Sequence, residues 1–359
     1  MEIGLIGLPL VGKTTFFNLL TGASWPTGIT GETKVHSGSA PVPDKRLDFI
    51  AALYQRERII YARVDFKDIP GLDPRRRDKA ASICFLGEVQ GADALCCVVR
   101  AFAVPEVPAY FEAVSPFREF QEILTELLLA DIILVEQRLE RLRSGRKVSK
   151  EAAAEVALLE RCLAALNDEE PLGRVPLAPE ERNPFAGYGF LTVKPVIIAV
   201  NLDEEGLKQG DYPQRKELLD YAAKREIPVI EVAAQIEAEI AELPPEDRTE
   251  FLKDLGLQEP GIARLAKAAY RCLGLLSFFT VGRDEVRAWV IREGTPAKKA
   301  AGKVHSDMER GFIRAEVFHF NDLFRLGTPA KVREAGLVRL EGKDYPVRDG
   351  DIIHFRFKV

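Results

Sequence analysis

The chain opens with a short apolar run, residues 2–6, followed by a glycine-bounded loop and an amphipathic stretch. This order predicts a strand, a loop and a helix. The loop Gly7-Leu8-Pro9-Leu10-Val11-Gly12-Lys13-Thr14 fits the pattern G-x-x-x-x-G-K-(S/T), in which backbone N–H groups at a helix N-terminus surround phosphates. The lysine of this pattern reaches the β- and γ-phosphates, and the hydroxyl ligates Mg²⁺. The predicted nucleotide-binding residues of the loop are Gly7, Pro9, Val11, Gly12, Lys13, Thr14 and Thr15.

Length and composition are those of a soluble globular protein with two or three domains. The chain has 359 residues, of which 47% are hydrophobic and 29% charged. It has no apolar run long enough to span a membrane and begins with a strand, not a basic signal region, so we expect a cytoplasmic protein with no membrane partner. Five cysteines without C-x-x-C spacing argue against a disulfide framework and a zinc site.

A second motif follows the next predicted strand, residues 62–66. Asp68 and Gly71 form a D-x-x-G pattern about 50 residues after the loop. An aspartate at such a strand end can hold Mg²⁺ through a water, and the glycine N–H can reach the γ-phosphate. We therefore predict Lys13, Asp68 and Gly71 as catalytic residues.

The polar stretch between these motifs, residues 23–39, is where a threonine completes the Mg²⁺ shell in phosphate-loop NTPases. Thr27, Thr30 and Thr33 are alternatives, and we assign Thr33, with Thr14 and Asp68, to the predicted metal site. Leu72 stands where Ras-like proteins have a water-orienting glutamine. Leucine cannot hydrogen-bond a water, so hydrolysis uses another group or is slow.

Two further buried strands are predicted at residues 94–99 and 196–200, and another at 227–232. The second of them runs into Asn201-Leu202-Asp203-Glu204, where GTPases have N-K-x-D. Leu202 replaces the lysine and Glu204 the aspartate that binds guanine, so guanine selectivity is not predicted. The third leads to Ala233-Ala234-Gln235, at the position of the base-stacking loop. The order of strands and loops is typical of a doubly wound α/β nucleotide-binding domain.

An insertion between these strands has apolar residues at helical spacing on two segments, joined by a basic, glycine-containing turn at 143–147. The pattern predicts an antiparallel helical hairpin. The apolar positions are Leu124, Leu128, Ile132, Val135, Leu139 and Leu142, then Val156, Leu159, Leu163 and Leu166. These residues form the seam between two helices; whether the hairpin also docks a partner stays open.

The C-terminal part has β-rich runs at 278–281, 287–291, 315–320 and 352–359, with a predicted helix at 296–303. This order fits a small β-grasp module. From residue 276 onward, 16 Lys and Arg stand against 12 Asp and Glu, a surplus of positive charge that fits either an anionic partner or an ordinary solvated surface. No RNA-reading motif is present, so sequence-specific binding does not follow.

With these motifs in this order, the sequence resembles the YchF / Obg-like ATPase family of P-loop proteins. The segments Glu285–Trp289, Ala301–Asp307, Gly311–Val317 and Leu340–Tyr345 are similar to the family's C-terminal TGS domain. The resemblance implies an α/β P-loop G domain at 1–116 and 174–275, an inserted coiled-coil hairpin at 117–173 and an α+β TGS domain at 276–359.

The resemblance also implies function. Members of the family bind and hydrolyse ATP at least as readily as GTP, with Mg²⁺, and associate with ribosomes. Lys13 and Thr14 would bind phosphate and metal, and Asp68 and Gly71 would sense the γ-phosphate. The base would lie between Asn201 and Glu204, with Leu202, Ala233, Ala234 and Gln235 around it. The ribosome or RNA would be met through the hairpin and the TGS domain.

The sequence departs from the family pattern at three places. Leu10 stands where the family loop has asparagine, and the switch after Leu72 is shortened to residues 73–79. Glu88 stands where the family has a histidine proposed as catalytic. A buried Glu88 with a raised pKa would act as a general base, whereas a salt bridge on a helix surface is the alternative.

Three functional hypotheses follow. The first is a cytoplasmic, monomeric nucleotide switch that hydrolyses ATP or GTP slowly and binds the ribosome. The second is a scaffold for ribosome or RNA that binds nucleotide without hydrolysing it, and the third is a GTP-preferring GTPase. None of the three involves sequence-specific DNA.

Overall fold

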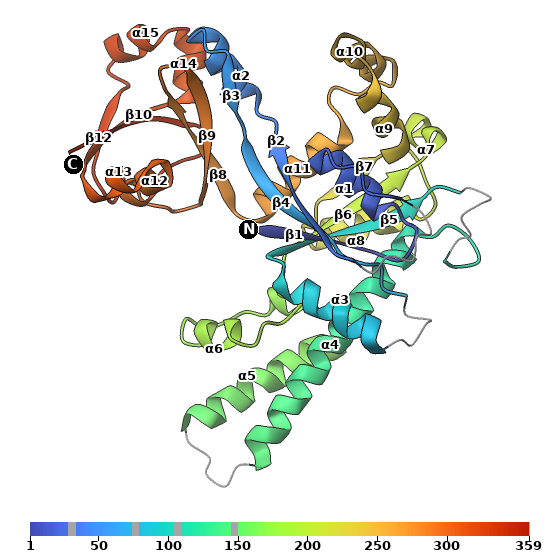
Figure 1. The fold of residues 1–359 in the computed structure, drawn as a ribbon. Helices are drawn as coiled ribbons and strands as arrows, with labels where there is room; N and C mark the ends of the chain where they lie inside the picture. The colour runs from blue at the N-terminus through green and yellow to red at the C-terminus, as the bar shows by residue number, and fades with distance from the viewer. Residues whose placement is uncertain (28–33, 74–78, 104–109, 145–149, 359) are drawn as a thin grey trace. The chain divides into compact units, whose positions relative to one another are not determined.

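A computed structural model describes residues 1–27, 34–73, 79–103, 110–144 and 150–358 (Figure 1). Contacts divide the chain into two compact units. The first unit is Met1–Gly38 with Asp65–Leu265, and the second is Ser39–Val64 with Ala266–Val359. Among the described residues, no helix combines the length and apolar character needed to cross a membrane.

The first sheet has six strands in the order β2-β4-β1-β5-β6-β7. The strands are β1 (Glu2–Ile6), β2 (His36–Val42), β4 (Ala62–Asp68), β5 (Ala94–Ala101), β6 (Val196–Leu202) and β7 (Val229–Val232). β1 pairs with β4 and β5, and β6 with β5 and β7, all in parallel. Every residue of β5 is buried, as expected for a central parallel strand covered on both faces. The doubly wound α/β prediction is confirmed.

The helices of the first unit follow the strands in a βα alternation (Figure 1). They are α1 (Lys13–Thr21), α3 (Lys79–Gly91), α4 (Pro116–Ser144), α5 (Lys150–Asn167), α6 (Arg182–Ala186), α7 (Glu204–Gln209), α8 (Arg215–Lys224), α9 (Ala234–Glu242) and α10 (Pro245–Asp254), with a 3-10 turn η1 (Leu172–Arg174). α11 (Gly261–Cys272) crosses the division between the units.

The helical hairpin is α4 followed by α5, and its apolar seam is as the sequence predicts. Figure 1 shows the two helices lying side by side and projecting from the sheet. Five of the ten predicted seam residues are buried in one apolar cluster, and the other five are partly buried and pack against it. At the base of the hairpin, the buried Asp131 carboxylate accepts hydrogen bonds from the backbone N–H groups of Leu191 and Thr192, each at 2.8 Å. This carboxylate fastens α4 to the segment that precedes β6.

The second unit is a six-stranded sheet of order β11-β10-β12-β8-β9-β3 with short helices. Its strands are β3 (Arg58–Ile60), β8 (Leu275–Val281), β9 (Glu285–Arg292), β10 (Phe312–His319), β11 (Arg339–Glu341) and β12 (Asp351–Phe357). Its helices are α2 (Lys45–Leu53), α12 (Ala297–Val304), α13 (Ser306–Arg310), α14 (Phe320–Leu326) and α15 (Pro329–Glu334). The parallel pairing of β8 with β12, and α12 packed in the core, agree with the predicted β-grasp module.

One segment lies elsewhere than the sequence prediction placed it. Residues 39–64 were predicted in the nucleotide-binding domain, whereas their contacts group them with the C-terminal residues. β3 pairs in parallel with β9, and the Phe49 ring of α2 lies 5.7 Å from the ring of Phe320. Short strands carry little sequence signal, and their partners here lie far along the chain, so the pattern could not reveal this pairing.

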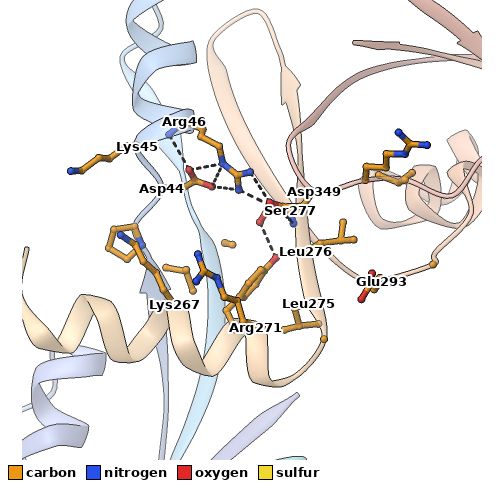
Figure 2. Close-up of a pocket in the computed structure, with 18 of the residues that line it drawn as sticks. Asp44, Lys45, Arg46, Lys267, Arg271, Leu275, Leu276, Ser277, Glu293 and Asp349 are labelled. Atoms are coloured by element: carbon orange, nitrogen blue, oxygen red, sulfur yellow. Dashed lines mark hydrogen bonds and ion pairs between the residues drawn. The ribbon is translucent and has the colours of Figure 1, made fainter. Parts of the chain in front are cut away.

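A charged clamp fixes the start of α2 within the second unit (Figure 2). The Arg46 guanidinium lies between two carboxylates, with Nη2 2.8 Å from Asp44 Oδ2 and Nη1 2.7 Å from Asp349 Oδ2. Asp349 also accepts the backbone N–H of Ser277, whose hydroxyl is bonded to Tyr270. This network lines a cavity of about 930 Å³.

Candidate functional site

The loop between β1 and α1 is folded tightly against its neighbours. Gly12 has a φ of 97°, and a Cβ there would lie 2.4 Å from Asn201 Nδ2. A Cβ on Gly7 would lie 2.4 Å from the carbonyl oxygen of Val98 in β5. Side chains at these two positions are therefore excluded, and α1 follows with Phe16 and Phe17 fully buried.

Leu10 is a non-glycine residue in the left-handed region, with φ of 63°. In this conformation the Cβ of an L-residue crowds the following carbonyl, at a cost of roughly 1–2 kcal/mol. Asparagine tolerates it better because its short polar side chain bonds locally. The departure from the family loop therefore falls at a position where asparagine suits the backbone better than leucine does.

Lys13 is buried inside the loop. Its Nζ donates hydrogen bonds to the carbonyl oxygens of Leu8 at 2.8 Å and Gly7 at 3.3 Å. Burial lowers the pKa of Lys13 to about 8, against the opposing charge of Asp68. A charged ammonium held by two weakly basic carbonyls is ready to exchange them for phosphate oxygens.

Thr14 and Asp68 meet at the carboxyl ends of β1 and β4. The Thr14 hydroxyl donates to Asp68 Oδ2 at 2.7 Å. Burial raises the pKa of Asp68, while this hydrogen bond and the charge of Lys13 lower it. The hydroxyl and carboxylate are hard oxygen donors, the kind that Mg²⁺ takes when nucleotide phosphates and water complete its shell. The described residues hold no cluster of three or more His, Cys, Asp or Glu that binds a metal without such help.

Gly71 and Leu72 follow Asp68 beside the loop. A Cβ on Gly71 would lie 2.9 Å from Lys13 Nζ, so the backbone passes directly over the lysine. Leu72 is 4% exposed and turned into the core. It therefore neither orients a water nor leaves room for one at that side chain.

Asn201 ties the two sides of the site together. Its Nδ2 donates to the carbonyl oxygen of Val11 at 3.0 Å, and its Oδ1 accepts the backbone N–H of Ala234 at 3.3 Å. Both bonds are buried, and Asn201 itself is 5% exposed at the end of β6. One side chain thus fixes the phosphate loop against the β7–α9 turn.

The residues predicted around the base differ in exposure. Leu202, Ala233 and Ala234 are buried, whereas Gln235 is exposed on the first turn of α9. The Glu204 side chain is 62% exposed and forms an ion pair with Lys208 one turn along α7. Asp203, between Leu202 and Glu204, caps α7 by accepting the N–H of Gly206 at 2.8 Å.

Glu88 is not brought to the site. Its Oε2 lies 3.0 Å from Lys67 Nζ, and the same ammonium lies 3.2 Å from Glu2. Glu2 begins β1, whereas the phosphate loop follows Ile6, about 13 Å farther along a strand that rises ~3.3 Å per residue. Glu88 therefore forms a salt bridge, as the alternative interpretation of the sequence held, and is not placed to act as a general base. Thr33, like Thr30, lies outside the described residues.

Sequence reasoning missed Glu119. It lies in the first turn of α4, is 2% exposed, and accepts the backbone N–H of Arg100 at 2.8 Å. Burial raises the pKa of Glu119 to about 7, although the N–H and the charges of Arg100 and Lys13 oppose the rise. The signal was a glutamate four residues before Ile123, on the same apolar face of the helix.

Comparisons with known proteins point to one family. The family model YchF-GTPase_C, described as a protein of unknown function (DUF933), matches residues 275–358. The protein named ribosome-binding ATPase YchF from Haemophilus influenzae is 40% identical over 366 residues, covering 100% of this chain and 99% of its own. The protein of the same name from Bacillus subtilis is 38% identical over 367 residues, covering 100% of both chains.

A solved structure gives the same result. The YchF GTPase of Schizosaccharomyces pombe superposes with a TM-score of 0.85 at 28% identity, covering 99% of this chain and 97% of that one. Because relatives at 38–40% identity and this solved structure match it from end to end, the chain belongs to the YchF family.

Proposed function

We propose that the protein is a nucleotide-driven switch that binds and slowly hydrolyses ATP, or GTP, and associates with the ribosome. The observation that carries the proposal is the junction of Lys13, Thr14 and Asp68, at which a buried ammonium and a hydroxyl–carboxylate pair meet at the phosphate loop. The names of its relatives, ribosome-binding ATPase and GTPase, support the same activity.

In this proposal the loop binds the phosphates. The backbone N–H groups of the loop from Gly7 to Thr15, apart from Pro9, which has none, would surround the phosphate oxygens. Lys13 would exchange its two carbonyl partners for them. Thr14 and Asp68 would hold Mg²⁺, which when bound neutralises charge on the β- and γ-phosphates. The N–H of Gly71, whose backbone lies over Lys13, senses the γ-phosphate. Thr33 stays a candidate for the remaining metal contact.

The base site accepts adenine at least as readily as guanine. Asn201 braces the loop, and Leu202, Ala233 and Ala234 offer an apolar surface with Gln235 at its edge. Glu204 points into solvent and pairs with Lys208, so its carboxylate is not held in place for guanine as the aspartate of N-K-x-D is. The relatives' names differ in the same way, since one is called an ATPase and another a GTPase.

Slow hydrolysis is expected because neither Leu72 nor Glu88, the two positions where a water-activating group was sought, can orient a water. Leu72 is buried, and Glu88 is engaged with Lys67 away from the phosphates. This observation also favours a second candidate function, a scaffold that binds nucleotide without turnover. In either case we propose a cytoplasmic monomer in which the hairpin, residues 117–173, and the C-terminal module meet the ribosome.

The first test compares equilibrium affinities for Mg²⁺-ATP and Mg²⁺-GTP in wild type and Glu204→Asp. We expect ATP to bind as well as GTP or better, and the aspartate variant to gain GTP affinity. A preference for GTP of more than about tenfold, or ~1.4 kcal/mol, would make this protein a GTPase instead.

The second test measures multiple-turnover phosphate release with and without ribosomes. A slow rate that Lys13→Ala abolishes supports the switch. Tight nucleotide binding without turnover, even with ribosomes present, would leave the scaffold as the better description.

A further inference from the structure

Glu119 lies where the hairpin helix meets the end of the central strand. Its carboxylate accepts the N–H of Arg100, the second-last residue of β5. Neighbouring β1 ends earlier, since Ile6 pairs with Cys97. Beyond Cys97 the edge of β5 that pairs with β1 no longer faces that strand, and the phosphate loop begins there.

The phosphate loop and Glu119 contact the same stretch of β5. Gly7 approaches the carbonyl oxygen of Val98 so closely that a Cβ would lie 2.4 Å from it. Glu119 binds β5 at Arg100, two residues farther, or about 7 Å along a strand. Arg100 in turn pairs in the sheet with Asn201, which holds the loop at Val11.

The charges that face Glu119 come from β5 and the phosphate loop. They are the guanidinium of Arg100 and the ammonium of Lys13, both of which lower its pKa. The Cys97 thiol also lies near, and burial raises the pKa of Cys97 to about 12, so it is uncharged near neutrality. Glu119 is therefore a buried carboxylate poised between its two charge states, with the phosphate-binding lysine as one of its two positive neighbours.

We propose that Glu119 is a positioning residue that couples nucleotide occupancy of the loop to the first turn of the hairpin helix. The negative charges of the polyphosphate and of ionised Glu119 repel each other. Bound nucleotide therefore disfavours the ionised form of Glu119, and the ionised form weakens nucleotide binding. Nucleotide binding therefore neutralises Glu119 by proton uptake and weakens its hydrogen bond to Arg100. The first turn of α4 loosens, which carries the nucleotide signal into the hairpin. The inference rests on the proposed nucleotide binding.

The test compares wild type with Glu119→Gln, which keeps a hydrogen-bond acceptor of the same shape and removes the charge. Affinity for Mg²⁺-ATP is measured from pH 6.0 to 7.5, a range over which Lys13, with a pKa of about 8, stays mostly charged. If nucleotide binding raises the pKa of Glu119 by one unit, the affinity of wild type relative to the variant falls about threefold as the pH rises from 6.0 to 7.5. Protonation of the nucleotide itself affects both proteins equally and cancels in the ratio of their affinities.

A matched control is Asp131→Asn, another buried carboxylate of α4 that binds residues 191 and 192 instead of the strand beside the loop. It should keep the wild-type pH dependence. Hydrogen exchange gives an independent readout: nucleotide should speed amide exchange in residues 117–120 of wild type and of Asp131→Asn, and leave that of Glu119→Gln unchanged.

Calorimetry of the unaltered protein covers the case in which Glu119→Gln does not fold. ATP binding at pH 7, measured in two buffers of different ionisation enthalpy, should take up roughly 0.4 proton per nucleotide. Uptake of roughly 0.1 proton or less, which Lys13 with its pKa of about 8 can supply alone, overturns the inference. A Glu119→Gln protein that matches wild type in both pH dependence and exchange overturns it too. Wild type that binds no nucleotide overturns the proposed function as well, so the two failures are distinct.

Discussion

At the scale of single residues, Leu72 lacks a group that could orient water, and its side chain also lies in the core where no water has room. Because its side chain is 4% exposed in the core, Leu72→Gln buries an amide instead of restoring a water-orienting group. We expect turnover to stay slow and the free energy of unfolding to fall by about 1–3 kcal/mol. Phosphate release and urea denaturation measure the two effects. A tenfold faster turnover would show that the side chain reaches the phosphates after all.

Leu10 provides a prediction of opposite sign. Its left-handed backbone conformation disfavours leucine, so Leu10→Asn should raise the free energy of unfolding by about 0.5–1 kcal/mol. The measurement is urea denaturation without nucleotide. Gly12→Ala is the contrasting variant, since its Cβ would meet Asn201, and it should lose both stability and nucleotide binding. Equal stability of Leu10→Asn and wild type would mean that leucine gains in packing what it loses in backbone strain.

Glu119 also predicts a pH dependence of folding. Its pKa is about 7 in the folded protein and near 4.5 in the unfolded chain, so the folded state holds this proton more tightly. The free energy of unfolding contributed by Glu119 therefore falls as the pH rises from 4.5 to 7. Between pH 5 and 8, Glu119→Gln should gain about 2–3 kcal/mol relative to wild type, at ~1.4 kcal/mol per pKa unit. Parallel stability curves for the two proteins would contradict this.

At the scale of elements, the charged clamp holds α2 on the second sheet. Arg46→Gln leaves the Asp44 and Asp349 carboxylates without their shared cation, and we expect it to lower the free energy of unfolding by about 2 kcal/mol. A double-mutant cycle with Asp349→Asn isolates the pair. Arg58→Gln is the matched control: its partner is Glu285, its side chain is 72% exposed, and its loss should cost under about 0.5 kcal/mol. Equal effects of the two arginine variants would contradict a structural clamp.

Elements with a strong local signal were predictable. The phosphate loop between β1 and α1, the fully apolar β5 and the ten-residue seam of the hairpin all follow from spacing along a short stretch of sequence. The three-residue β3 did not, because its pairing with β9 depends on a contact between distant parts of the chain. Glu119 was missed because a glutamate on an apolar helix face is identified only by what it touches.

At the scale of the whole molecule, the second unit is built from two separate stretches of chain. Residues 266–359 alone lack the edge strand β3 and the helix α2, whose Phe49 ring lies 5.2 Å from the ring of Phe324. We expect this fragment to unfold without cooperativity and to bind a peptide of residues 39–64, which restores a cooperative thermal transition. Circular dichroism with and without the peptide tests this. A fragment that melts cooperatively by itself would show that the segment is an addition to a self-sufficient domain.

The same division has a consequence for biosynthesis. Residues 39–64 leave the ribosome early, but β9, the strand that β3 joins, is made more than 200 residues later. At ~5–20 residues per second, α2 and β3 wait roughly ten seconds to a minute for their partners. During this time β2 and β4 can already join the first sheet, while residues 45–60 between them form an open loop. This loop exposes Leu47 and Ile50, which are both fully buried in the folded protein. Each newly made copy therefore passes through a stage at which a pause in translation, or a bound chaperone, would change the fraction of chains that fold.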